Sequence, residues 1–358
     1  MPECLPVRPL FLWRPDIAKH ALTKRNLSLL GGTLLSVFFL WLAFRRVNLG
    51  EVWGAMRQAN LLWVGFALLT FLVTQVVKAV RWRVLFFPEH HDRRLGKLQR
   101  VIYIGQLVNA AIPARLGEVA RAYLLGRIEG ISTAYALGTV VLEKALDSLM
   151  LLLVVFLVSL FMPLPIWLKG SSLIISGGMV ALLILMTLLS RWEDRMPGWL
   201  DRVFGPQSWL TRAGATGAIQ RAALSLRPLR SLRMNLQLWG WSLVDWLIMI
   251  STNLVLLWAF GLRLPWTAAP LLLAVLNIGI VVPSSPGRIG VVHYLCVLTL
   301  GLYGVDKALA LAYGILLHAL IYVPVFVLGA YFLWRENYDL SRLAALASAG
   351  SLGEKATD

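Results

Sequence analysis

The residues best suited to bind an anion lie in two short segments of similar pattern, each of which interrupts an apolar stretch. Both segments read Pro-x-Arg-x-Gly, one at 113–117 with Arg115 and the other at 286–290 with Arg288. Proline ends an incoming helix, and glycine lets the backbone approach a ligand closely. Arginine offers a permanently charged, planar fork that binds phosphate through two hydrogen bonds. The two segments therefore predict the binding of a phosphate group.

Other polar residues extend this pattern. Arg121 follows Arg115 by six residues, and an asparagine lies upstream of each segment. A helix that begins near Arg115 would also direct unsatisfied N–H groups at the same anion. The candidate phosphate ligands are Asn109, Arg115, Arg121, Asn277 and Arg288. The predicted helix breaks are Pro113, Gly117, Pro283, Pro286, Gly287 and Gly290.

A simpler interpretation of the two segments is that proline and glycine only end helices. Arg115 would then be a charge near the cytoplasmic edge, and Arg288 a tolerated charge in a loop. Arg288 is flanked by apolar sequence, and an arginine within the membrane has a functional role by default. Anion binding is therefore the preferred interpretation.

Several carboxylates also occur within apolar stretches, where an unpaired charge is costly. Glu143 and Asp147 are four residues apart and share one face of a helix, with Lys144 beside them. Asp245 holds a roughly equivalent position later in the chain. We expect these carboxylates to face the interior of a helical bundle. Pairing with the arginines is the first interpretation, and proton relay or cation binding are the alternatives.

Glu118, His293 and His318 complete the predicted charge partners or proton carriers. Glu118 lies three residues after Arg115 and three before Arg121, so one carboxylate can hold both arginines. The two histidines are candidates for protonation near neutral pH. The alternative for His318 is a hydrogen-bonded interior residue without a functional role.

The composition places this chemistry in a membrane. Of the 358 residues, 58% are hydrophobic and 15% are charged, whereas a soluble domain has about 45–50% and about 25%. This balance excludes a soluble enzyme, a disordered chain and a fibrous protein. In so apolar a chain, a net charge of +16 is typical of basic cytoplasmic loops that face anionic lipid. It does not indicate binding to nucleic acid. The two cysteines do not imply a disulfide framework.

Six apolar segments are long enough to cross a bilayer, which takes about 20 residues. They cover residues 27–44, 61–80, 132–164, 171–189, 236–260 and 306–334. Two further stretches are too short or are interrupted, and we expect them to form re-entrant hairpins over 101–130 and 266–304. The predicted fold is an all-α polytopic membrane protein. It has about six full transmembrane helices and two oppositely oriented re-entrant hairpins, which together form an inverted repeat.

The distribution of basic residues predicts the orientation. With both termini in the cytoplasm of a cell and the chain in its plasma membrane, the inner segments carry roughly four times as many lysines and arginines as the outer ones. Residues 1–26 form a basic cytoplasmic N-terminus, 27–335 the membrane domain and 336–358 a cytoplasmic tail. The loop at 191–235 alternates tryptophan with arginine, which is typical of helices on an anionic membrane surface or of a solvated connector.

Four groups of residues resemble the flippase-like family typified by the transmembrane region of lysylphosphatidylglycerol synthase. The resemblance extends over about residues 27–335 and implies a protein that moves an anionic lipid between leaflets. The chain resembles the membrane half of the bifunctional synthases, without their soluble aminoacyl-transferase domain. It departs from the family at Arg288, where a glycine is usual, and at His293, where a glutamate is usual. The resembling groups are Arg81-Trp82-Arg83, Asn109 with Pro113 to Arg121, Glu143 with Asp147, and Pro283 to Gly290.

The predicted function is therefore that of a lipid flippase. Its cargo would be a phospholipid, an aminoacyl-phospholipid or a polyprenyl-phosphate glycolipid. The alternatives are a membrane-embedded transferase that uses a polyprenyl-phosphate sugar donor, and a scaffold that recruits a partner through 191–235. No catalytic, cofactor or metal motif is visible in the sequence, which favours a transporter over an enzyme. Expected partners are lipids with anionic headgroups, with a second copy of the chain or a separate lipid-modifying enzyme as candidate protein partners.

Overall fold

The computed structural model describes residues 33–45, 47–87, 94–112, 116–162, 215–279 and 286–339, with isolated helical positions between 177 and 191. Every regular element in these residues is a helix, in agreement with the predicted all-helical class. The N-terminal segment 1–26 lies outside the described residues. So do most of the span expected at 171–189, the first part of the loop at 191–235, and most of the tail.

The long helices follow the predicted apolar segments closely. The first helix is Thr33–Phe44, within the segment predicted at 27–44. The elements before the cytoplasmic loop are α2 (Leu49–Gln58), α3 (Leu61–Val84), α4 (Leu95–Ala111), α5 (Gly117–Glu129) and α6 (Thr133–Ser159). Those that follow are α10 (Ala215–Leu224), η2 (Arg227–Arg230), α11 (Leu232–Ala259), α12 (Ala268–Gly279), η3 (Pro286–Arg288), α13 (Val291–Gly301) and α14 (Lys307–Arg335).

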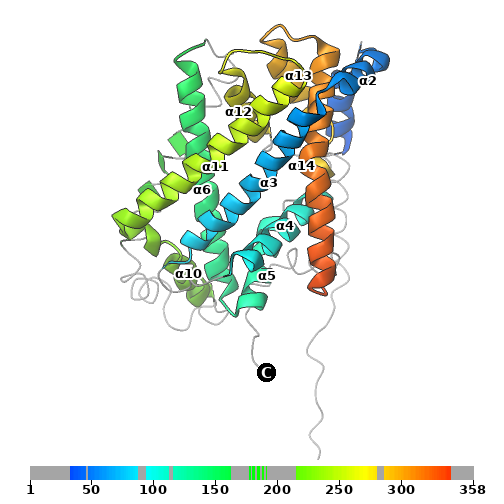
Figure 1. Ribbon diagram of the computed structural model, residues 1–358. Helices are drawn as coiled ribbons and strands as arrows, with labels where there is room; N and C mark the ends of the chain where they lie inside the picture. The colour runs from blue at the N-terminus through cyan, green and yellow to red at the C-terminus, as the bar shows by residue number, and fades with distance from the viewer. Residues whose placement is uncertain are drawn as a thin grey trace, which may run out of the picture.

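Helices α3 and α11 run antiparallel through the molecule and contact each other over much of their length (Figure 1). Helix α6 packs against α11, and α14 packs against α3. The pair α4 and α5 lies toward one end of this bundle, and the pair α12 and α13 toward the other (Figure 1). The end that carries α5 and α10 is called the lower end here.

Helix α3 shows an arrangement suited to lipid. Its exposed face is a stripe of large apolar side chains spaced three and four residues apart, Leu62, Phe66, Leu69, Val73 and Val76. The opposite face buries polar groups, among them Thr74 and Gln75. Apolar residues outside and polar residues inside are the pattern expected of a helix whose solvent is hydrocarbon.

Three helices of the described residues, α3, α11 and α14, are long and apolar enough to cross a membrane. The helix at Thr33–Phe44 and α2 form a bent pair that would add a fourth. Helix α6 is 27 residues long, but it carries Glu143, Lys144 and Asp147 in its middle. The long apolar helices of the described residues are those of a multi-pass membrane protein. The predicted number of six crossings and the re-entrant course of the two hairpins stay predictions.

Helix α10 and η2 lie at the lower end, within the loop expected at 191–235. Helix α10 packs against the beginning of α6, so closely that a Cβ atom on Gly138 would lie 2.2 Å from Ser225 Oγ. Part of the loop therefore belongs to the packed bundle, because the small residue at position 138 lets the two segments meet.

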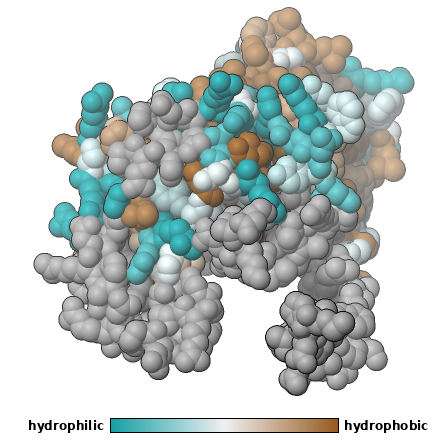
Figure 2. Space-filling model, turned by 90° about the horizontal axis from the view of Figure 1, so that it is seen from below, coloured by the Kyte–Doolittle hydropathy of each residue, from teal (hydrophilic) through white to brown (hydrophobic). Residues whose placement is uncertain are grey.

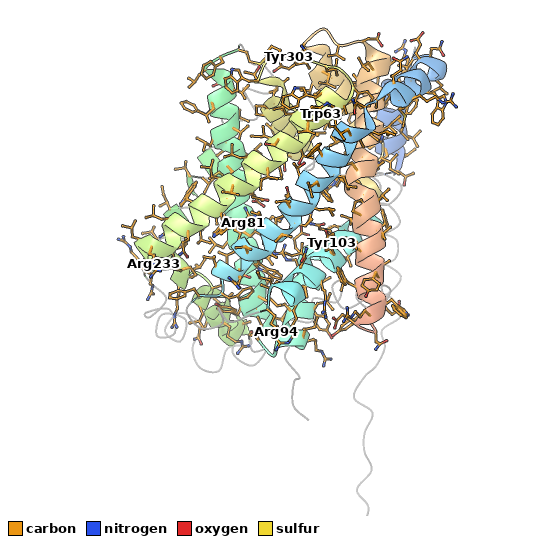
Figure 3. The ribbon with its side chains drawn as sticks, in the orientation of Figure 1. Trp63, Arg81, Arg94, Tyr103, Arg233 and Tyr303 are labelled. Carbon is orange, nitrogen blue, oxygen red and sulfur yellow. The ribbon has the colours of Figure 1, made fainter. Side chains whose placement is uncertain are left out.

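The lower end is rich in hydrophilic side chains (Figure 2). Arg94 and Arg233 lie there, whereas Trp63 and Tyr303 lie at the other end (Figure 3). This distribution is the one that the basic loops predict for a cytoplasmic lower end.

Cysteine labelling tests this orientation in intact cells. We expect Arg263→Cys, in the exposed connection between α11 and α12, to react with a membrane-impermeant maleimide, and Arg233→Cys to react only after the cells are opened. Both variants carry Cys4→Ser, while Cys296 stays because it is fully buried. Labelling of Arg233→Cys from outside would reverse the predicted orientation.

Candidate functional site

Arg81, on the lower half of α3, lies at the centre of a buried group of charges (Figure 3). Its Nη1 atom lies 2.7 Å from Asp147 Oδ1 and 3.6 Å from Asp245 Oδ2. Its Nη2 atom lies 3.6 Å from Glu143 Oε1. Carboxylates from α6 and α11 thus surround one guanidinium. These four residues are called the Arg81 cluster.

The Arg81 cluster is incompletely hydrogen-bonded. Nη1 donates to Asp147 and, at 3.4 Å, to Ser242 Oγ. The Nε and Nη2 atoms of Arg81 and both carboxylate oxygens of Asp245 have no hydrogen-bond partner among the described residues. One guanidinium cannot neutralise three carboxylates, and buried charges are stable only when they are paired. The cluster therefore depends on further cations from neighbouring helices.

Arg121, on α5, supplies one of these cations. Its guanidinium pairs with the carboxylate of Glu143, and its Cζ atom lies 3.8 Å from the centre of the Trp82 ring. Trp82 Nε1 in turn donates to Thr139 Oγ1 at 3.0 Å. A desolvated contact between a cation and an aromatic face contributes about 2 kcal/mol. The pairing of Glu143 with a hairpin arginine, expected from the sequence, is thus observed.

The antiparallel hairpin of α4 and α5 holds Arg121 in place. Asn109 Oδ1 accepts a hydrogen bond from the Gly117 N–H group at 2.8 Å, which satisfies a free donor at the start of α5. A Cβ atom on Gly117 would lie 2.0 Å from the Gly105 carbonyl oxygen. Glycine is therefore needed at position 117 so that the two helices can approach.

A polar cavity of about 70 Å³ opens where α3, α4, α5 and α6 meet. Among the described residues that line it, Ile102 and two glycines are the ones that are not polar or charged. A volume of this size has room for a few water molecules or a small polar group. The polar lining residues are Lys78, Gln106, Asn109, Glu118, Arg121, Glu143, Lys144 and Asp147.

Two charged groups of the cavity, Lys78 and Glu118, form no ion pair among the described residues, although Lys78 attracts the carboxylate of Asp245 electrostatically. Lys78 is half-buried. Glu118 Oε2 and the amide oxygen of Gln106 are buried without a hydrogen bond. Lys144 is exposed at the edge of the cavity, 3.8 Å from Asp147. The accessible part of the site is therefore lined by lysines, while most of the carboxylate charge is buried behind them.

The structure brings together six of the residues predicted from the sequence to form a site. They line the cavity and are Asn109, Gly117, Glu118, Arg121, Glu143 and Asp147. A seventh predicted residue, Asp245, contacts Arg81. Pro113, Arg115 and Pro283 lie outside the described residues. Asn277 does not line the cavity, and its amide donates to the Leu273 carbonyl within α12.

The remaining predicted residues form a second group at η3. His318 Nε2 lies 2.8 Å from the Gly287 carbonyl oxygen, and His293 Nδ1 accepts a hydrogen bond from the Gly290 N–H group at 3.3 Å. Arg288 lies beside the Tyr322 hydroxyl group. The element η3 contacts α4, the helix that precedes the first broken segment.

Four functional candidates, Lys78, Arg81, Gln106 and Lys144, are not among the site residues predicted from the sequence. Arg81 lies just beyond the apolar segment expected at 61–80, but α3 continues to Val84. The available signal was the Arg81-Trp82-Arg83 group shared with the family. Lys78 was visible as a lysine within an apolar span, one turn before Arg81.

A buried cluster of balanced charges inside a bundle of apolar helices defines the class of the protein as a polytopic membrane protein with a polar interior site. The sequence model of one family, described as the lysylphosphatidylglycerol synthase TM region, matches residues 29–329. The chain therefore belongs to this family, as the resemblance predicted.

Two curated relatives are similar to the chain. Glycosyltransferase AglD of Haloferax volcanii is 26% identical over 332 residues, which cover 82% of this chain and 52% of that protein. The UPF0104 membrane protein MJ1078 of Methanocaldococcus jannaschii is 26% identical over 233 residues, which cover 62% of this chain and 91% of that protein. The chain thus spans about half the length of AglD. No solved structure matches it significantly.

Removal of the central guanidinium should destabilise the fold. We expect Arg81→Leu to lower the free energy of unfolding in detergent by about 3–5 kcal/mol, because three carboxylates lose their shared cation. The control is Arg100→Leu, which breaks a partly exposed pair with Glu336 and should cost at most about 1 kcal/mol. Equal losses for the two variants would contradict the central role of Arg81.

The close contact in the α4–α5 hairpin can be tested with two alanine substitutions. Gly117→Ala should lower the free energy of unfolding by about 1–3 kcal/mol, because the added methyl group meets the Gly105 carbonyl oxygen. Gly96→Ala, in the same hairpin, has no atom within 4 Å of the new methyl group and should be neutral or stabilising. Thermal unfolding of both purified variants provides the comparison, and a neutral Gly117→Ala would refute the contact.

Proposed function

We propose that this protein moves a lipid with an anionic headgroup between the leaflets of the membrane. The observation that carries the proposal is the polar cavity, since it lies inside a bundle whose exposed surface is apolar. A lipid headgroup needs a polar environment to cross, while its acyl chains can stay in the surrounding hydrocarbon. The charged residues of α3, α5 and α6 offer such an environment at the level of Arg81.

The arrangement of charges favours a phosphate group as the part of the lipid that binds. Lys78 and Lys144 line the cavity and are more exposed than Arg81 and Arg121, whose guanidinium groups are already paired. A phosphate can therefore contact the lysines without first breaking the Arg81 cluster. Arg121 and Asn109, at the hairpin, are close enough to the same space to provide further hydrogen bonds.

The two broken segments support a transport path between them. The helix pairs that contain them, α4 with α5 and α12 with α13, lie toward opposite ends of the bundle (Figure 1), and a Cβ atom on Gly287 would lie 4.0 Å from the Ala110 carbonyl oxygen. Opposed broken helices that meet inside the membrane are typical of inverted-repeat transporters. In this proposal the two hairpins are re-entrant, the lower end faces the cytoplasm of the cell, and the membrane is the plasma membrane.

A second candidate function is a membrane-embedded transfer reaction on a polyprenyl-phosphate lipid. The similarity to a protein named as a glycosyltransferase favours it, although that protein is about twice as long as the matched region. The same cavity would then hold the donor phosphate, with a carboxylate such as Glu118 as base. The two functions differ in one observable, because a transferase changes the lipid chemically and needs no second leaflet.

A vesicle assay tests the proposal. We expect the purified protein in sealed liposomes to move a fluorescent phosphatidylglycerol between leaflets. Lys78→Ala should reduce the affinity of the protein for this lipid about tenfold to a hundredfold, and transport with it, because the variant loses a charge-assisted hydrogen bond to the phosphate. Lys97→Ala, which breaks a half-exposed pair with Glu129 outside the cavity, is the control and should behave like the unchanged protein.

Three results would decide against lipid movement through the cavity. The first is that liposomes containing the unchanged protein show no lipid movement, and the second is that the Lys78→Ala protein transports lipid at an unchanged rate. The third is chemical conversion of a polyprenyl-phosphate sugar by the protein in detergent. The last result would instead favour the transferase.

A further inference from the structure

The turn at η3 has an unusual backbone. Gly287, Arg288 and Gly290 have φ angles of 72°, 56° and 93°, all in the left-handed region. Glycine adopts this conformation freely, but a residue with a Cβ atom is strained in it. Arg288 and Asn337 are the two non-glycine residues with positive φ in the described part of the chain. Asparagine tolerates the conformation better than arginine does.

The surrounding helices hold this strained turn from two sides. His318, on α14, contacts the Gly287 carbonyl oxygen at 2.8 Å, and His293, on α13, accepts a hydrogen bond from the Gly290 N–H group. The two imidazole rings lie 5.1 Å apart. These contacts fix the backbone on both sides of Arg288, and they explain how the strain is maintained.

The guanidinium of Arg288 has no carboxylate partner among the residues that the structure describes. It is partly buried and lies beside the Tyr322 hydroxyl group, but no acidic residue in the described parts of the chain forms an ion pair with it. An unpaired cation in an apolar bundle is costly, and here it also sits on strained backbone. Strain of this kind persists where it serves a function.

We propose that Arg288 forms a second anion site, which binds the phosphate group of a lipid headgroup together with the Tyr322 hydroxyl group. The site is distinct from the polar cavity, since Arg288 does not line it. It adjoins the end of α4 at Ala110, one residue beyond Asn109 of the cavity lining. The inference rests on the proposed transport and gives the phosphate a second position on its path.

The test uses a substitution that relieves the strain while it removes the ligand. Arg288→Gly introduces a residue that adopts positive φ without strain. The melting temperature of this variant in detergent should therefore equal or exceed that of the unchanged protein. Its affinity for dihexanoyl-phosphatidylglycerol, titrated into the purified full chain, should nevertheless fall about tenfold to a hundredfold. Arg288→Lys should retain part of the affinity, because a point charge replaces the planar fork.

The matched control is Asn337→Gly, which changes the other strained position, at the end of α14. It should leave both lipid affinity and transport unchanged, since no cation is lost. A second titration with inorganic phosphate separates the two sources of the anion. Binding of inorganic phosphate at Arg288 without binding of the lipid would overturn the assignment to a headgroup.

The outcomes separate this inference from the proposed function. If Lys78→Ala loses transport while Arg288→Gly keeps full affinity and transport, the second site is refuted and the cavity stands. If the unchanged protein moves no lipid but Arg288→Gly still loses affinity for it, the anion site stands and the transport proposal fails. An Arg288→Gly protein that is less stable than the unchanged protein would contradict the strain argument, and the affinity of Arg288→Lys then decides the role of the charge.

Discussion

In the interior of a membrane, a guanidinium surrounded by carboxylates is stable only while its partners keep their positions, because no water can replace a lost contact. Arg81 imposes this constraint on the bundle. Its partners come from α6 and α11, and Glu143 in turn needs Arg121 from α5. Four helices are therefore fixed to one another by charge as well as by packing. The relative position of α3 and α6 at this level also determines the shape of the polar cavity, since its lysines and carboxylates lie on the same turns as the paired groups.

The cluster contains both satisfied and unsatisfied members, and the difference suits a transporter. The buried pairs give the bundle a defined structure, whereas Glu118 in the adjoining cavity keeps a buried oxygen atom that has no hydrogen bond among the described residues. A site that must bind a headgroup and then release it benefits from partners that are present but not saturated. The hairpin of α4 and α5 contributes through close backbone contact at Gly105 and Gly117, which brings Arg121 to the cavity.

The chain belongs to the lysylphosphatidylglycerol synthase TM region family. The turn at Arg288 departs from what the resemblance to this family implies. A glycine is expected there from the family resemblance, and the left-handed backbone at Arg288 is the conformation that glycine would prefer. Arg288 thus combines the backbone conformation typical of a glycine turn with a cationic side chain.

The sequence by itself determined the class of fold, the helical segments and the candidate charges, because apolar length and buried carboxylates are local properties of a membrane chain. It also indicated that Glu143 would pair with a hairpin arginine. It could not identify Arg81 as the centre, since the apolar run ends before it and its partners lie 62 or more positions away along the chain. The tertiary structure alone decided which cations are paired and which are free. That distinction depends on distances between helices, and those distances are set by side-chain packing and by glycine contacts that no spacing in the sequence reveals.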